Sequence, residues 1–289
     1  MASAQLAIWS IITPIALKRD GLAACSRYSG LSRFDMPLVS LNGFEMYYEV
    51  RGEGEPLLLL HGGMGIGNDW RHIFAADPDG YRVVVPDLRG HGRSTNPAKR
   101  FTFRECGRDL LALLDHLRIT RTKAIGISMG AKTLLHVATM QPDRVAAMVL
   151  VSATPYFPQA LRTAAAQFTR EAFERLSDSD RNVLRSRHVR GDEQILHLYD
   201  MTRSFATSYD DMAFTPTLLG TITARTLIVH GDRDPFYPVD MAIELFRGIP
   251  QSALWIVPNG GHAPVFGSMA PTFTAAALAH LAGATSTSR

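Results

Sequence analysis

Five short apolar runs in this chain each lead directly into a polar, glycine-containing loop, and this pattern constrains the fold more than any other feature. The runs lie at 57–60, 83–85, 123–127, 226–229 and 253–257. A continuous apolar run of this length is typical of a strand buried on both faces, as in a parallel sheet. Further strands are expected at 38–42, 44–50 and 146–151, and helical patterns fill the gaps at 69–76, 103–117, 129–140, 239–247 and 269–281. The alternation predicts an α/β fold, with a mostly parallel, doubly wound sheet of eight strands and helices on both faces.

The loop after 123–127 carries a serine between two glycines, Gly126-Ile127-Ser128-Met129-Gly130. A side chain at either glycine would clash where the backbone turns sharply from strand to helix. The turn also puts Ser128 at a helix N-terminus, where unpaired N–H groups favour negative charge. A motif with only three fixed positions occurs by chance too often to identify a nucleophile by itself, so the interpretation depends on the other loops.

Those other loops supply the groups that a nucleophilic serine needs. The run at 57–60 ends in His61-Gly62-Gly63-Met64-Gly65, a turn whose backbone N–H groups can point inward as an oxyanion hole requires. The runs at 226–229 and 253–257 lead to Asp232 and Asp234 and to His262. Because open α/β sheets place their sites at the carboxyl ends of the strands, we expect serine, acid and histidine to converge there.

With these motifs in view, the chain resembles the capped, carboxylesterase-like serine hydrolases of the α/β-hydrolase fold superfamily, from about Val39 to Leu281. Five motifs in the expected order carry the resemblance. They are the His-Gly turn at 61–62, the Asp-x-Arg-Gly-x-Gly-x-Ser loop at 87–94, the serine turn at 126–130, Gly-x-x-Asp at 231–234 and Gly-His at 261–262.

The resemblance implies a role for each matching residue. Ser128 matches the nucleophile, and His262 matches the general base that later acts as general acid. The family's acid lies three residues after the glycine, which favours Asp234 over Asp232. The implied oxyanion donors are the backbone N–H groups of Gly63 and Met129, with Met64 as a further candidate donor.

Residues 154–221 interrupt the alternation, because they contain helical patterns at 159–176, 178–188, 192–206 and 209–219 with no strand-like run. This insertion after the sixth strand matches the family's helical cap, and we call it the cap segment. The predicted organisation is an extension at 1–35, a core at 36–153 and 222–284, the cap segment, and a frayed tail at 285–289. Apolar side chains expected to contact substrate are Met64, Phe157, Met201, Phe205, Met212 and Phe236.

A serine hydroxyl is a weak nucleophile until a base removes its proton, and histidine is suited to that exchange. A carboxylate at position 128 would indicate haloalkane or epoxide chemistry, whereas serine indicates acyl transfer. We therefore expect a cofactor-independent hydrolase of small to medium, largely apolar carboxylic esters. Carbon–carbon bond hydrolysis, lactone or amide cleavage, a perhydrolase or cofactor-free haloperoxidase side activity, and a slow-turnover ligand-binding receptor stay open as alternatives.

Composition argues against several other classes. The net charge is +3, and the arginines are dispersed among acids and apolar residues, so no nucleic-acid footprint is expected. No stretch reaches the ~18 apolar residues of a membrane span. Cys25 and Cys106 fit neither a zinc nor a redox spacing, and no paired histidine motif indicates a metal. We expect a cytoplasmic enzyme with a small-molecule substrate, and the sequence predicts neither its natural substrate nor its oligomeric state.

Overall fold

One eight-stranded sheet runs through residues 38–283, the part of the chain that the computed structural model describes. The predicted extension (1–35), the tail (285–289) and Cys25 lie outside these residues. The sheet order is β1-β2-β4-β3-β5-β6-β7-β8. The strands are β1 (Leu38–Leu41), β2 (Phe44–Arg51), β3 (Glu55–Leu60), β4 (Tyr81–Pro86), β5 (Thr122–Ile127), β6 (Val145–Val151), β7 (Arg225–Gly231) and β8 (Ser252–Val257).

The sheet is parallel except at the edge formed by β1 and β2. β2 pairs antiparallel with both β1 and β4, whereas the pairs from β4 across to β8 are parallel. The predicted α/β class and mostly parallel sheet are therefore confirmed. A parallel sheet brings the carboxyl ends of β3, β5, β6, β7 and β8 to one edge, where the loops carrying the predicted site residues begin.

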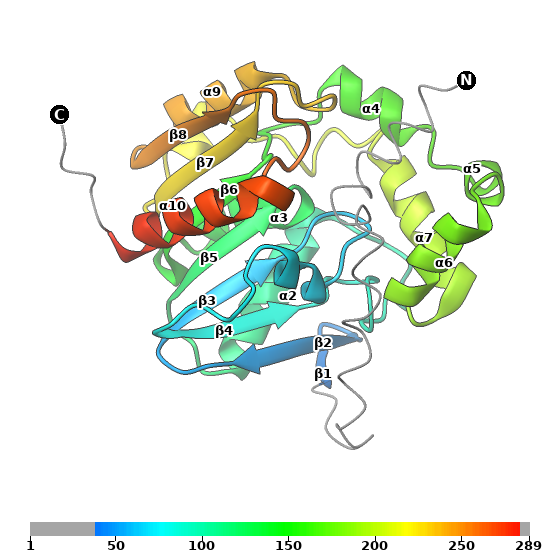
Figure 1. Cartoon of the computed structure of the whole chain (residues 1–289), viewed down its shortest axis with the longest axis horizontal. Coiled ribbons are helices and arrows are strands. Elements are labelled where there is room, and N and C mark those ends of the chain that lie inside the picture. The colour runs from blue at the N-terminus through cyan, green and yellow to red at the C-terminus, as the bar shows by residue number, and fades with distance from the viewer. Residues whose placement is uncertain (1–37, 284–289) are drawn as a thin grey trace.

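Alternate residues of the strands pack against helices on opposite faces, which explains why the runs are apolar throughout. Leu58 and Leu60 of β3 belong to the core beneath α2 (Phe103–His116), α3 (Met129–Met140) and α9 (Val239–Gly248). Leu57 and Leu59 belong to a second core beneath α10 (Ala270–Ala282), which Figure 1 shows on the other face. The predicted helices on both faces are thus present.

The helix predicted at 69–76 is wrong in type and length. The structure has a 3-10 helix, η2 (Gly67–His72), whose start is fixed by the N–H of Ile66 donating to the Asp69 carboxylate (2.9 Å). Trp70 and Phe74 are buried in the second core, which accounts for the apolar pattern.

The cap segment follows β6 and precedes β7, as predicted. Its helices are α4 (Gln159–Ala165), α5 (Arg170–Glu174), α6 (Asp178–Arg187), α7 (Gly191–Ser204) and α8 (Pro216–Leu219), and α4 to α7 gather on the right of Figure 1. Two predicted helices are shorter than expected. The pattern at 159–176 is split where the Thr169 hydroxyl caps α5, and that at 209–219 is helical only after Thr215 caps α8. The division into core and cap domains stays a prediction.

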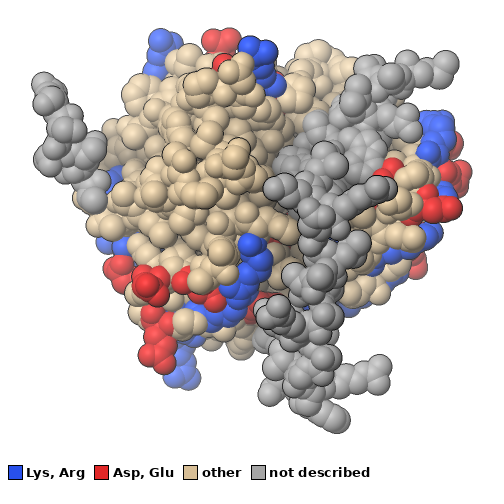
Figure 2. Space-filling model, viewed as in Figure 1, with Lys and Arg blue, Asp and Glu red and all other residues tan. Residues whose placement is uncertain are grey.

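Polar contacts attach the cap segment to the loop at 87–94 and to η2. The Gln194 amide of α7 donates to the carbonyl oxygens of Gly90 and Gly92 (2.9 Å each), and Arg187 at the end of α6 forms an ion pair with Asp69. Figure 2 shows that basic and acidic side chains intermix on the face drawn rather than separating by sign. No helix within 38–283 is long and apolar enough to cross a bilayer.

Candidate active site

The turn between β5 and α3 holds Ser128 in a conformation that few residues adopt. Its φ is 49° and its ψ −101°, and its N–H donates to the carbonyl oxygen of Val151 (2.8 Å). A Cβ on Gly126 would lie 2.6 Å from the Ala131 nitrogen, and one on Gly130 would lie 2.4 Å from the Leu60 carbonyl oxygen. Both glycines are therefore required for the turn to pack against the sheet, as the sequence predicts.

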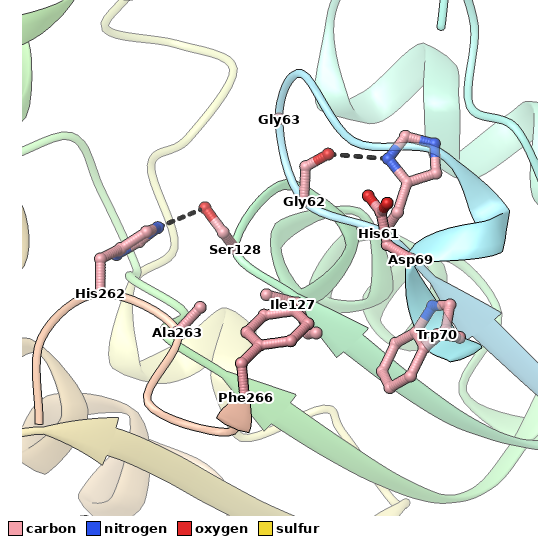
Figure 3. Close-up of a pocket in the computed structure, with 10 residues that line it drawn as sticks. All are labelled: His61, Gly62, Gly63, Asp69, Trp70, Ile127, Ser128, His262, Ala263 and Phe266. Carbon is pink, nitrogen blue, oxygen red and sulfur yellow. Dashed lines mark hydrogen bonds between the residues drawn. The ribbon is translucent and has the colours of Figure 1, made fainter. Parts of the chain in front are cut away.

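The loops after β5, β7 and β8 bring three predicted side chains into one hydrogen-bonded row. The Nε2 atom of His262 lies 2.9 Å from the Ser128 hydroxyl, and its Nδ1 atom lies 2.7 Å from a carboxylate oxygen of Asp234. Figure 3 shows the ring of His262 turned toward Ser128. Asp232, the alternative acid, is exposed.

Asp234 is held as an ionised hydrogen-bond acceptor. Its second carboxylate oxygen accepts the backbone N–H groups of Phe236 (2.9 Å) and Tyr237 (3.1 Å). Burial by itself would raise the pKa of Asp234, but the charge and hydrogen bond of His262, together with the Phe236 N–H and the His230 ring, hold that pKa below its ordinary value. An ionised Asp234 fixes the proton of His262 on Nδ1, so Nε2 is free to accept the Ser128 proton.

A second serine, Ser152, supports the loop that carries His262. Its hydroxyl accepts the backbone N–H of Ala263 (2.9 Å), and its own N–H donates to the Val229 carbonyl oxygen (2.9 Å). Ser152 and Ala263 both have positive φ, 50° and 54°. The sequence reasoning missed Ser152, although its place directly after β6, at the edge where the site forms, could have indicated it.

The His-Gly turn and the start of α3 lie side by side. The N–H of Gly130 donates to the carbonyl oxygen of His61 (3.1 Å), and the methyl group of Met129 lies 3.4 Å from the position of a Cβ on Gly63. As the first residue of α3, Met129 has an N–H without an acceptor in its own helix. Gly63 lines the same pocket as Ser128. Met64 is buried, has a φ of 56°, and is not among the described residues that line this pocket.

His61 has a structural place beside the nucleophile. Its Nε2 accepts the backbone N–H of Leu88 (2.9 Å), so its Nδ1–H donates to the Gly62 carbonyl oxygen (2.7 Å). Burial lowers the pKa of His61 to about 3, so the ring is neutral at physiological pH. The ring therefore joins the His-Gly turn to the loop at 87–94, which is a structural role.

The pocket beside Ser128 has mainly apolar walls. It is lined by His61, Gly62, Gly63, Asp69, Trp70, Ile127, Ser128, His262, Ala263 and Phe266 (Figure 3). Trp70 and Phe266 were not predicted from the sequence, because one lies in the misassigned helix and the other in the loop after His262. Within 38–283, no group of three or more His, Cys, Asp or Glu side chains is arranged to hold a metal ion.

The side chains predicted to contact substrate lie elsewhere in the described residues. The ring of Phe236 packs edge-on against the ring of His262, with 5.1 Å between centroids. Phe157 and Phe205 pack against each other (5.2 Å), and Met201 and Met212 are buried in the core that the cap segment shares with α2 and α3. Within the described residues, the pocket beside Ser128 is lined neither by these side chains nor by that of Met64.

Comparison with known proteins is consistent with this architecture. Residues 55–190 match the family model of the alpha/beta hydrolase fold. The chain is 27% identical to the 2-hydroxy-6-oxo-6-(2'-aminophenyl)hexa-2,4-dienoic acid hydrolase of Metapseudomonas resinovorans over 263 residues, which cover 85% of this chain and 89% of that protein.

Two solved structures superpose on most of the chain. One is the enol-lactonase of Burkholderia xenovorans LB400, with a TM-score of 0.70, 21% identity and coverage of 85% of this chain and 100% of the other. The second is a meta-cleavage product hydrolase of Pseudomonas fluorescens IP01, with a TM-score of 0.68, 21% identity and coverage of 84% and 96%. At this identity, the superpositions establish the fold alone.

Proposed function

Because this chain belongs to the α/β-hydrolase fold superfamily, we propose that it is a serine hydrolase that cleaves carboxylic esters through a covalent acyl-enzyme. One observation carries the proposal: the His262 ring bridges the hydroxyl of Ser128 and the carboxylate of Asp234 at hydrogen-bonding distances. A nucleophile, a base in contact with it and a group that orients the base are the parts that covalent acyl transfer needs.

The reaction would run in two half-reactions. Ser128 Oγ attacks the ester carbonyl while His262 Nε2 takes the hydroxyl proton, and the resulting imidazolium is stabilised by Asp234. The negative charge on the former carbonyl oxygen would be stabilised by the N–H groups of Gly63 and Met129. His262 then protonates the departing alcohol, and it next activates a water that releases the acid and regenerates Ser128.

The substrate is proposed to be a small to medium ester with a largely apolar acyl or aryl portion. Trp70, Ile127, Ala263 and Phe266 form apolar surface beside Ser128, and such surface stabilises a substrate by removing apolar groups from water. The acyl-transfer chemistry itself requires no cofactor, because the side chains supply the nucleophile and the base.

Carbon–carbon bond hydrolysis is the second candidate. The relative from Metapseudomonas resinovorans, which matches along most of its length, is named as a hydrolase of a 2-hydroxy-6-oxo-dienoic acid. A triad of this kind is compatible with either reaction, so the choice depends on how the substrate lies against Ser128. A lactone is a cyclic ester and therefore falls within the first proposal.

A substrate panel distinguishes the candidates. Short and medium p-nitrophenyl esters, a lactone, an anilide and a 2-hydroxy-6-oxo-dienoate should be compared by kcat/KM, with Ser128→Ala as the matched inactive variant. The proposal predicts the highest kcat/KM on an ester and loss of that activity in Ser128→Ala. A preference of at least tenfold for the dienoate would move the assignment to carbon–carbon hydrolysis, and ester turnover retained by Ser128→Ala would refute both.

A further inference from the structure

One carboxylate in the wall of the pocket beside Ser128 has no part in the proposed reaction. Asp69 lies on η2, which follows the His-Gly turn, and only 6% of this residue is exposed. A Cβ on Gly65 would lie 2.8 Å from its Oδ2 atom and 2.9 Å from the Gly62 carbonyl oxygen, so the carboxylate lies against that turn. Figure 3 shows Asp69 between the turn and Trp70. A buried acid thus stands beside the loop that carries a proposed oxyanion donor.

The two oxygens of the Asp69 carboxylate have different surroundings. Oδ2 accepts the backbone N–H of Ile66 (2.9 Å) and a guanidinium N–H of Arg187. Oδ1 accepts no hydrogen bond from any residue within 38–283. The indole nitrogen of Trp70 also has no partner there, but it is fully enclosed by protein atoms, whereas Oδ1 is not. Since Asp69 lines the pocket, Oδ1 is an unused acceptor that a bound molecule can reach.

The other accessible polar side chains in the pocket wall already have partners. Both ring nitrogens of His61 are hydrogen-bonded to backbone groups. His262 bridges Ser128 and Asp234. Arg187 is not among the described residues that line the pocket. A bound molecule therefore contacts the acid of the ion pair and not its guanidinium, so the pocket offers that molecule a hydrogen-bond acceptor.

A hydroxyl group fits this acceptor better than other common polar groups do. A carboxylate or an ether oxygen has no hydrogen to donate and would place one acceptor against another. An ammonium group can donate, but Arg187 already balances the charge of Asp69, so the ammonium would be buried without a counter-charge of its own. A hydroxyl donates one hydrogen bond and adds no charge.

We propose that Asp69 is a specificity-determining residue, whose Oδ1 atom accepts a hydrogen bond from a hydroxyl group on an otherwise apolar ester. The proposal rests on the serine hydrolase function proposed above and narrows its substrate class to hydroxylated esters. A hydrogen bond to an ionised acceptor is stronger than one between neutral groups, so an ester without the hydroxyl is the poorer substrate. Anionic substrates are disfavoured, because the pocket presents them with a carboxylate oxygen.

The test compares p-nitrophenyl hexanoate with the same ester carrying a hydroxyl on C2, C3 or C6, as separate enantiomers where they exist. Each kcat/KM is divided by the rate of hydroxide-catalysed hydrolysis of the same ester, because a hydroxyl also changes the reactivity of the carbonyl group. We expect the best hydroxylated ester to exceed the hexanoate about tenfold or more, since one hydrogen bond to a charged acceptor is gained. The 3-amino ester and the anionic mono-p-nitrophenyl adipate should show no such gain.

Asp69→Asn removes the charged acceptor and keeps the shape of the side chain. The new amide oxygen would accept from Ile66 and Arg187, as Oδ2 does, so the amide NH2 would face the pocket and could only donate. The kcat/KM of the best hydroxylated ester, relative to that of the adipate ester, should therefore fall about tenfold or more. A residue that only supports η2 would change both esters alike.

Asp77→Asn is the matched control. Asp77 also forms ion pairs with arginines, Arg51 (3.1 Å) and Arg71 (3.2 Å), but it is not among the described residues that line the pocket. Its replacement should keep the substrate preference of the unmodified chain.

If no hydroxylated ester exceeds the hexanoate in the unmodified chain, the proposal is overturned, whether or not the Asp69→Asn protein folds. A preference kept in full by an Asp69→Asn protein that urea unfolding shows to be folded would also overturn it. Ser128→Ala separates the two claims. Ester turnover retained by that variant refutes the proposed function, whereas turnover that depends on Ser128 but shows no hydroxyl preference refutes only the role of Asp69.

Discussion

The carboxyl edge of the sheet and the cap segment are held in place by different kinds of contact. At the sheet edge, backbone groups fix the reacting side chains: the Val151 carbonyl oxygen accepts from Ser128, and two N–H groups hold Asp234. In the cap segment, side chains mainly pack against one another, as the rings of Phe168 and Tyr199 do at 5.2 Å.

This difference predicts how each region should respond to substitution. Because the backbone holds each reacting side chain in place, removing that side chain should abolish activity while the chain stays folded. A packed apolar side chain can be replaced by one of similar volume at small cost, because neighbouring rotamers adjust. The following substitutions test the contrast from the largest expected effect to the smallest.

Ser128→Ala should lower kcat on a p-nitrophenyl ester by about 10,000-fold or more, because the nucleophile is lost while the rest of the turn remains. The unfolding free energy should stay close to that of the unmodified chain, since the backbone contacts of residue 128 do not involve its hydroxyl. Steady-state kinetics and urea unfolding measure the two effects. If the Ser128→Ala protein lost activity only because it unfolded, the predicted difference between the sheet edge and the cap segment would be contradicted.

Asp234→Asn and Asp232→Asn form a matched pair two residues apart. The first should lower kcat by about 1,000- to 10,000-fold, because an amide no longer holds the His262 proton on Nδ1. The second alters an exposed side chain and should leave kcat within about twofold of the unmodified chain, since surface changes away from special contacts have small effects. Equal losses of kcat in the two variants would contradict the assignment of Asp234 as the acid of the triad.

Arg187→Met tests how firmly the cap segment is attached to the core. It leaves the carboxylate of Asp69, a pocket-lining residue, buried without its ion-pair partner, which typically costs about 3–5 kcal/mol of unfolding free energy. Arg185→Met breaks an exposed pair with Asp192 and should change the unfolding free energy little. Urea unfolding of both variants measures the difference, and equal stabilities would show that the buried pair does not fasten the segment.

Phe266→Ala and Met212→Leu compare a pocket wall with the packed cap segment. Removing the Phe266 ring should raise KM for a medium-chain ester about tenfold more than for an acetate, because apolar contact with the acyl chain is lost. Met212→Leu conserves volume in the core and should leave the chain-length preference unchanged. A shift of preference in Met212→Leu alone would place the acyl chain in the cap segment.

The strands were predictable because each is a continuous apolar run with a turn at its end. The run at 226–229, for example, is the centre of β7 (Arg225–Gly231), and only the ends differ. The helix at 69–76 was not predictable, because its apolar spacing comes from burial of Trp70 and Phe74 under the sheet rather than from a regular helix. The spacing of apolar residues indicates which positions are buried, and several backbone conformations can produce the same spacing.

The row of Ser128, His262 and Asp234 could be expected from motifs, because a strand followed by a glycine-containing loop determines where each side chain emerges. The pocket walls could not, since Phe266 faces Ser128 only through the path of the loop after His262. The pairing of Asp69 with Arg187 is likewise invisible in the sequence, because the two residues lie far apart in the chain and meet only where α6 of the cap segment lies against η2.

Labelling with a fluorophosphonate, read by intact mass and peptide mapping, tests the central claim most directly. The account predicts rapid addition of one equivalent per chain on Ser128, abolished in Ser128→Ala and slowed in Asp234→Asn but not in Asp232→Asn. Ester hydrolysis that continues at full rate while Ser128 stays unlabelled, or a stoichiometric label on another residue, would contradict it.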